Sequence, residues 1–300
     1  MPHSFLDSTL SMFRLAPLLI SKEALAEFLV RFDYHIKSST QPPEYSKIVS
    51  EKIKALQDQD ETISITSDYT DRSIPESIAV HYISGFLSYE KCWWYSSTKQ
   101  LIEDVEAAET NEKIIGHAFL INSPGGESYC LEKAHEIISN LKKPSRTICE
   151  RTMCSAGLYL GCASDKVYCL NKFDIVGSIG TMISYWDFRK ALEKMGYVLV
   201  EAYASLSTHK NKVSDDLTAG QPEDFIKRFL DPLQADFDAA VKRSRPRAAK
   251  ADEDAHIFNG EIFYAQEALG LGLIDGIKDI QEIFQELYEQ GKIQNKIYSL

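Results

Sequence analysis

The sequence lacks the long apolar segment that a membrane-spanning or secreted protein requires. Its short apolar stretch near the N-terminus, residues 15–20, is interrupted by Pro17 and followed at once by Lys22 and Glu23. A helix needs roughly 20 apolar residues to span a bilayer, and a signal peptide needs about 7–15 without a break. We therefore expect no integral membrane segment and a cytoplasmic location.

Cysteine pairs, metal-ligand spacings and nucleotide-binding loops are also lacking. The six cysteines of the 300-residue chain form no CxxC pair, which argues against a disulfide scaffold and a zinc site. His81, His117 and His135 are scattered, so we expect no metal. Neither GxxxxGK[ST] nor GxGxxG occurs at the glycine-rich loop, so we expect no cofactor. The formal net charge of -11 argues against binding to nucleic acid, because like charges repel.

What is present indicates a globular chain with an N-terminal extension. Hydrophobic residues make up 44% of the sequence and charged residues 26%, as in ordinary soluble domains. The apolar face of residues 21–36 predicts a helix, a second helix is expected near 44–58, and residues 66–77 are interpreted as a linker. The expected units are a helical extension and linker over 1–75, a main domain over 76–280 and a C-terminal helix over 281–300.

Strand-like and helical patterns alternate from residue 78 onward. Residues 114–122 form a near-continuous apolar run, which is typical of a strand covered on both faces. Repeated strand–helix units predict an α/β fold with mostly parallel strands. The expected strands include 78–87, 114–122, 145–150, 166–170, 175–184 and 197–204, and the expected helices include 97–111, 126–143, 154–164 and 187–196.

The segment LINSPGG, residues 120–126, interrupts a buried strand with a proline and two adjacent glycines. We expect this strand to end here and to open onto a helix at about Glu127. Glycine lets main-chain N–H groups approach a ligand because no Cβ is in the way, and ligands gather at the carboxyl ends of parallel strands. Such groups could hold a phosphate, stabilise an oxyanion or close a tight turn.

The segment MCSAGLYLGCAS, residues 153–164, places small residues directly after a serine. Ala156 and Gly157 would let a helix begin immediately after Ser155. The unpaired N–H groups and partial positive charge of a helix N-terminus suit a developing oxyanion. The alternative is that Ser155 is an N-cap that packs a small-residue helix against the sheet.

Four motifs occur in a fixed order: NSPGG, CSAGLYLGCASDKVY, VGSIGTM and STHK. Together they resemble the signal peptide peptidase A family of serine proteases, which includes phage head-maturation proteases. The later segment FNGEIFYAQEALGLGLIDGI, residues 258–277, is similar to the end of that family's catalytic domain. The resemblance covers about residues 78–280 and implies a crotonase-like or caseinolytic-protease-like fold, with 76–280 as the catalytic domain.

The resemblance also implies a role for each matching residue. It implies that Ser155 is the nucleophile and Lys210 the general base. Gly126 and Ala156 would be the main-chain oxyanion donors, with Gly125 as the alternative to Gly126. The hydroxyl of Ser178 would hydrogen-bond the lysine amine. Small members of the family resemble oligomers whose serine and lysine can come from neighbouring subunits. We therefore expect a homo-oligomer whose activity falls on dilution.

The residues themselves bear on the choice of base. A serine nucleophile needs a partner that removes its proton, and no histidine lies near Gly180, where a caseinolytic protease would place one. A lysine, with a pKa of about 10.4, must have that pKa lowered by roughly 3 units to act near neutrality. Burial can supply this change. The alternatives are that Lys210 is a solvated loop residue, or that Lys212 is the base.

We expect a serine endopeptidase that binds an extended polypeptide beside the SPGG strand. The expected substrates are scaffold or capsid proteins of a phage or prophage head, so the enzyme would also occur within phage proheads. Degradation of remnant signal peptides is an alternative. Two further alternatives are an acyl-CoA hydratase or isomerase, whose paired donors hold an enolate, and a catalytically silent scaffold protein.

Overall fold

The computed structural model describes residues 18–20, 45–58, 62–90, 96–184, 187, 189–250 and 256–298. The helix expected over residues 21–36 lies outside these residues. None of the helices in the described part of the chain combines the length and apolar character that crossing a bilayer requires.

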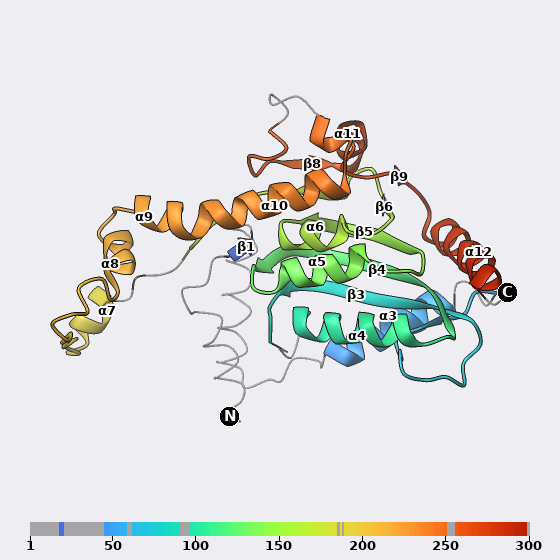
Figure 1. Ribbon diagram of the computed structural model, residues 1–300, viewed down its shortest axis with the longest axis horizontal. Helices are drawn as coiled ribbons and strands as arrows, with labels where there is room; N and C mark the ends of the chain where they lie inside the picture. The colour runs from blue at the N-terminus through green and yellow to red at the C-terminus, as the bar shows by residue number, and fades with distance from the viewer. Residues whose placement is uncertain are drawn as a thin grey trace.

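A nine-stranded, mostly parallel sheet forms the centre of the molecule (Figure 1). Its strands are β1 (Leu18–Ile20), β2 (Ile65–Thr66), β3 (Ser77–Leu87), β4 (Ile114–Glu127), β5 (Ser145–Cys154), β6 (Lys166–Cys169), β7 (Ile175–Gly177), β8 (Ile262–Tyr264) and β9 (Gly276–Ile277). The main path β2–β3–β4–β5–β6–β9 is parallel throughout, and β7 is parallel to β5. β1 runs antiparallel to β4, and β8 antiparallel to β7. The predicted α/β fold is confirmed.

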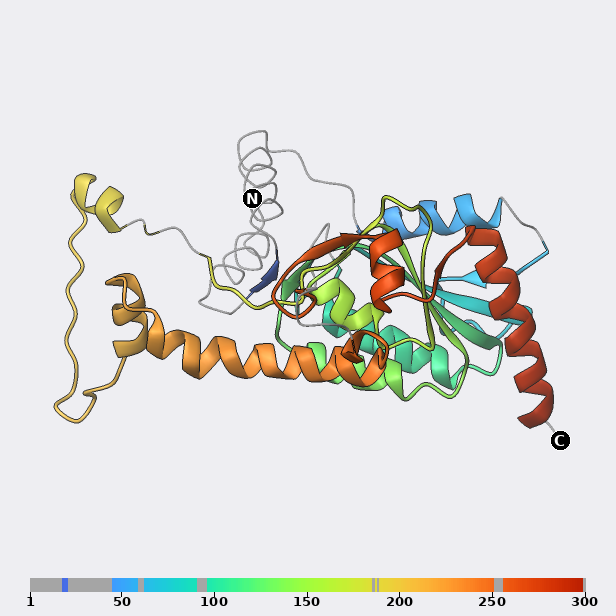
Figure 2. The same cartoon turned by 90° about the horizontal axis from the view of Figure 1, so that it is seen from above.

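Helices cover both faces of this sheet (Figure 2). Those packed on one face are α4 (Thr98–Thr110), α5 (Leu131–Ser139), α6 (Ala156–Gly161), α10 (Asp231–Ser244) and α11 (Ala265–Leu271), and those on the other are α3 (Tyr45–Gln57) and α12 (Ile280–Tyr298). Neighbouring residues of β4 alternate between the two cores: Phe119 and Ile121 face the first, and Ala118 and Leu120 face the second. This burial on both sides explains the unbroken apolar run over 114–122.

β4 continues through the two glycines, contrary to the prediction that the strand ends there. β3 accompanies it to the end, pairing Phe86 with Gly125 and Leu87 with Gly126. A Cβ on Gly126 would lie 2.0 Å from the carbonyl oxygen of Leu87, so glycine allows the two strands to stay paired. α5 therefore begins at Leu131 instead of near residue 126.

An arm, residues 189–230, projects from the sheet (Figures 1 and 2). It contains α7 (Arg189–Lys194), α8 (Lys212–Thr218), α9 (Glu223–Phe225) and a π-helical turn η1 (Ile226–Leu230), which continues into α10. The strand predicted over 197–204 is wrong, because this segment has no neighbouring strand within the described residues. Val198 and Val200 are 82% and 85% exposed.

Candidate active site

Ser155 occupies the turn between β5 and α6 in a backbone conformation that residues with a side chain seldom adopt. Its φ is 52° and its ψ is -119°. The residue is completely buried, and its N–H donates to the carbonyl of Gly177 at 2.9 Å. Its Oγ makes no capping bond and has no hydrogen-bond partner among the described residues. The structure therefore does not support the N-cap interpretation of this serine.

The end of β4 lies beside Ser155 because α6 packs closely against that strand. β5 pairs with β4 as far as Met153, which faces Ser123, and then leaves the sheet at Ser155. The position that a Cβ would take on Gly157 lies 3.2 Å from the carbonyl oxygen of Ser123, so the first turn of α6 lies close against the end of β4. Beyond Met153, β5 no longer pairs with β4. We call the edge of β4 that is left without β5, along residues 125–127, the Ser155 edge.

Two of the predicted oxyanion donors belong to this corner. Ala156 is the first residue of α6, where main-chain N–H groups have no partner within the helix, and it is fully buried. Gly126 lies in the last part of β4. Gly125 has a φ of 113°, and its N–H donates to Oγ of Ser123 at 3.2 Å. The Gly125 N–H group thus already has a partner.

Ser178 also lies close to Ser155 along the sheet. β7 pairs with β5 so that Gly177 faces Cys154, and these are the last residues of the two strands. Ser178 and Ser155 directly follow them. Ser178 is half-buried, has a φ of 55°, and donates its N–H to the carbonyl of Glu261 at 2.6 Å. The structure therefore brings together Ser155, Ser178 and the glycines of β4.

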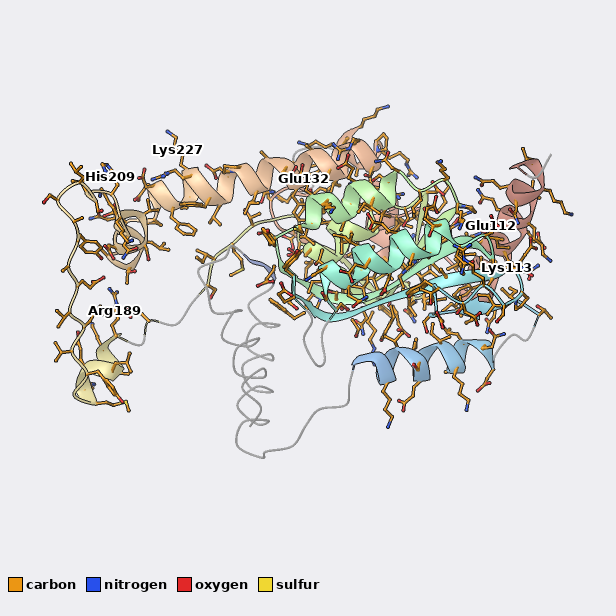
Figure 3. The ribbon with its side chains drawn as sticks, turned by 60° about the horizontal axis from the view of Figure 1, so that its bottom comes forward. Glu112, Lys113, Glu132, Arg189, His209 and Lys227 are labelled. Atoms are coloured by element: carbon orange, nitrogen blue, oxygen red, sulfur yellow. The ribbon has the colours of Figure 1, made fainter. Side chains whose placement is uncertain are left out.

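Lys210 lies elsewhere within the same chain. It is exposed in the arm, in the turn before α8, and Figure 3 labels the preceding residue, His209, at the far end of the molecule from the sheet. Lys212 is exposed too and bonds Asp216 at 2.7 Å, an interaction that raises its pKa. That change is opposite to what a general base requires. A single chain does not place either lysine at Ser155.

α10 connects the arm to the part of the molecule that holds Ser155, through buried polar contacts. Tyr159 of α6 hydrogen-bonds Asp236, and Nε2 of His135 on α5 lies 3.1 Å from Oγ of Ser244. Arg245, just after α10, donates to the carbonyl of Ser164 at 2.6 Å and pairs with Asp275 at 2.6 Å. α10 is therefore fixed to α6 at Asp236 and to α5 at Ser244.

Two buried histidines that are far apart in the sequence, His81 and His117, form a chain of contacts with Glu109. Nε2 of His81 lies 3.1 Å from Nδ1 of His117, whose Nε2 lies 3.0 Å from a carboxylate oxygen of Glu109. Burial lowers the pKa of both histidines, so both are neutral near pH 7. They were 36 positions apart in sequence, and parallel pairing of β3 and β4 places them side by side.

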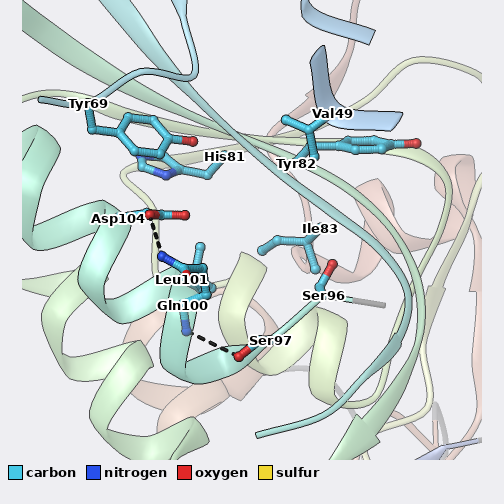
Figure 4. Close-up of a pocket in the computed structure, with 10 residues that line it drawn as sticks. All are labelled: Val49, Tyr69, His81, Tyr82, Ile83, Ser96, Ser97, Gln100, Leu101 and Asp104. Carbon is cyan, nitrogen blue, oxygen red and sulfur yellow. Dashed lines mark hydrogen bonds between the residues drawn. The ribbon is translucent and has the colours of Figure 1, made fainter. Parts of the chain in front are cut away.

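A small pocket of about 70 Å³ adjoins His81 (Figure 4). It is lined by Val49, Tyr69, His81, Tyr82, Ile83, Ser96, Ser97, Gln100, Leu101 and Asp104. Its volume suits a few water molecules. Ser155, Ser178 and the β4 glycines are not part of this lining, so the pocket is separate from the candidate site.

One group of potential metal ligands lies among the described residues: Cys149, Cys169 and Asp174, whose ligand atoms lie within 4.8 Å of one another. The Asp174 carboxylate accepts main-chain N–H bonds from Arg151, Leu170 and Asn171. The hydrogen bond with Cys169, followed by burial, raises the pKa of Cys149 well above its ordinary value. The main-chain bonds give the Asp174 carboxylate a structural role, and the three side chains offer one ligand fewer than the four of a structural zinc site.

More than half of the sequence matches known proteins. The model of peptidase family S49 matches residues 138–294. "Serine protease SPPA, chloroplastic" of Arabidopsis thaliana is 25% identical over 186 residues, which cover 60% of this chain and 26% of that protein. "Na(+)/H(+) antiporter NhaA" of Brucella abortus is 30% identical over 178 residues, covering 57% of this chain and 23% of that protein. The chain thus spans about a quarter of the length of these two relatives.

Solved structures give weaker likenesses. A mutant of the 1510-N membrane-bound stomatin-specific protease has a TM-score of 0.46 and 15% identity, over 70% of this chain and 84% of the other. ClpP1 from Listeria monocytogenes has a TM-score of 0.41 and 12% identity, over 68% and 94%. Because the family model matches more than half of the 300 residues, this chain belongs to peptidase family S49.

Proposed function

We propose that this chain is a serine endopeptidase with Ser155 as its nucleophile. The observation that carries the proposal is the Ser155 hydroxyl, which is buried and lacks a partner among the described residues, on a strained backbone. Strain of this kind is typical of functional sites, because the surrounding fold must stabilise it. Membership of a peptidase family and the name of the Arabidopsis relative support this chemistry.

In the proposed reaction, Oγ of Ser155 attacks the carbonyl carbon of a peptide bond while the Lys210 amine removes the hydroxyl proton. The N–H groups of Gly126 and Ala156 stabilise the negative oxygen. Gly126 is favoured over Gly125 because the N–H of Gly125 already bonds Ser123. The protonated Lys210 then gives its proton to the leaving amine as the peptide C–N bond breaks, which leaves an acyl group on Ser155. The Lys210 amine next deprotonates a water molecule, which attacks the acyl carbon and releases the product acid from Ser155.

The general base comes from a second copy of the chain in this proposal. Lys210 belongs to an exposed arm, and the same arm carries an exposed apolar segment in which Leu199 is 73% and Leu206 96% exposed. Contiguous exposed apolar surface is typical of protein–protein interfaces. Docking of this arm on a neighbouring chain would cover the segment and bring Lys210 to Ser155, where the half-buried Ser178 could bond its amine.

The substrate is proposed to be an extended polypeptide that pairs with the Ser155 edge of β4. A strand added to a sheet edge is held through main-chain bonds, which any sequence can supply. The family that the motifs resemble includes phage head-maturation proteases, and this supports scaffold or capsid proteins as the natural substrates. This narrower statement predicts that such a protein is cleaved in proheads that contain the wild-type enzyme and is not cleaved in proheads that contain Ser155→Ala.

A serine-directed fluorophosphonate tests the proposed chemistry. We expect the probe to label Ser155, the label to be absent in Ser155→Ala, and its rate to fall by at least about 100-fold in Lys210→Ala. Lys212→Ala, on the same exposed arm, is the matched control and should retain the rate. Failure to label Ser155, or turnover of enoyl-CoA without cleavage of casein, would contradict the proposal.

A further inference from the structure

The short strand β1 pairs with the glycine-rich end of β4. It runs antiparallel to β4, with Leu18 opposite Glu127, Leu19 opposite Gly126 and Ile20 opposite Gly125. These are the residues of β4 that the proposed function assigns to oxyanion stabilisation and peptide binding. The chain therefore places a segment of its own main chain at the candidate site.

The edge of β4 to which β1 adds follows from the pairing of the other strands. Gly125 and Gly126 are already paired on one edge with Phe86 and Leu87 of β3. A strand has two edges, so β1 must occupy the opposite one, along which β5 runs as far as Met153. Figures 1 and 2 both show β1 at this end of the sheet, next to α6. β1 thus lies on the Ser155 edge.

We infer that β1 is an intramolecular competitor of the substrate, held in the place that a substrate strand would take. This inference rests on the proposed function, since it concerns the same edge. A polypeptide substrate must displace β1 before its main chain can pair with β4. The segment is three residues long, so few main-chain bonds need to be broken, and the tether keeps its local concentration high.

The inference makes a specific kinetic prediction. A competitor that only reduces the fraction of open chains weakens apparent substrate affinity and leaves the chemical step unchanged. Removal of β1 from the edge should therefore lower KM for an extended peptide while kcat stays the same. A small fluorophosphonate does not pair along the strand, so removal of β1 should change its rate of labelling of Ser155 less than it changes KM for the peptide.

Proline substitutions in the full-length chain test this prediction, because proline removes a strand's N–H donor. Alternate residues of a strand turn their N–H groups to opposite sides. Either Leu19→Pro or the pair Leu18→Pro and Ile20→Pro therefore removes the N–H donors that face β4. The other variant removes donors on the opposite side and is the matched control. We expect one of the two to lower KM for a quenched fluorescent decapeptide by about fivefold or more.

Addition of a synthetic peptide with the sequence of residues 14–24 provides a second measurement that does not depend on folding of the variants. It should inhibit competitively, and more strongly in the variant with the lower KM. The inference would be overturned if Ser155 were labelled while KM stayed unchanged in both variants and the peptide did not inhibit. Absence of labelling in every form, including the wild type, would instead count against the proposed function.

Discussion

At the scale of single residues, Ser155 combines strain and burial where an ordinary helix start would have neither. A φ of 52° is unfavourable for any residue with a Cβ, and the buried hydroxyl lacks a partner among the described residues. Both features lower the stability of the fold locally, as expected if Ser155 is the nucleophile that we propose. The sequence indicated the position of this serine, through the small residues that follow it, but could not indicate the strain.

Comparison of Ser155→Gly with Ser155→Ala should isolate this strain. Both variants remove the hydroxyl, but only glycine adopts the positive φ without penalty. We expect Ser155→Gly to be more stable than Ser155→Ala by about 1 kcal/mol, measured as the free energy of unfolding in urea. Equal stabilities, or a more stable alanine variant, would show that the backbone at this position is not strained.

Acid should destabilise the protein through His135, which is buried between α5, α6 and α10. Burial, with a smaller contribution from Arg243, lowers its pKa from 6.5 to about 4. Between these two values the unfolded chain binds a proton that the folded chain does not. The contribution of this residue to stability is therefore fully present above pH 6.5 and is lost as the pH falls towards 4, by about 3 kcal/mol.

The comparison of wild type with His135→Gln measures that contribution. Urea unfolding at pH 7 and pH 4.5 should show a smaller loss of stability on acidification in the variant. His209→Gln, in the exposed arm, is the matched control and should follow the wild type. An identical pH dependence in all three proteins would contradict the assignment.

At the scale of elements, periodicity predicted most of the sheet and its covering helices. The apolar pattern placed β3, β4, β5 and β6 because burial on two faces leaves a strong signal in a strand. The helix predicted over 126–143 was too long, because pairing with β3 keeps Gly125 and Gly126 in the sheet. That pairing depends on residues about 40 positions away, which no local pattern contains.

Gly126→Ala tests the close contact that keeps the two strands paired. Its Cβ would lie 2.0 Å from the Leu87 carbonyl oxygen, so β3 or β4 must move. We expect the free energy of unfolding to fall by about 2 kcal/mol or more. Gly270→Ala, where a Cβ would meet nothing within 4 Å, is the control and should be neutral or slightly stabilising. A stability unchanged by Gly126→Ala would contradict the described register.

At the scale of the whole molecule, the candidate site is divided between the sheet and the arm. The sequence motifs predicted both Ser155 and Lys210 as site residues, but they contain no information on whether one chain or two would bring these residues together. The predicted strand over 197–204 failed for a related reason: its apolar pattern needs a partner that the described part of one chain does not offer. An assembly of two or more copies would account for both observations.

Complementation between two inactive variants tests this central claim most directly. Ser155→Ala and Lys210→Ala chains are unfolded together, mixed in equal amounts, refolded and assayed for peptide cleavage and fluorophosphonate labelling. If the dyad forms between copies, about a quarter of the sites combine an intact serine with an intact lysine, and activity returns to about that fraction of the wild type. Activity that stays at the level of the separate variants, while the wild type refolded in the same way is active, would contradict the account.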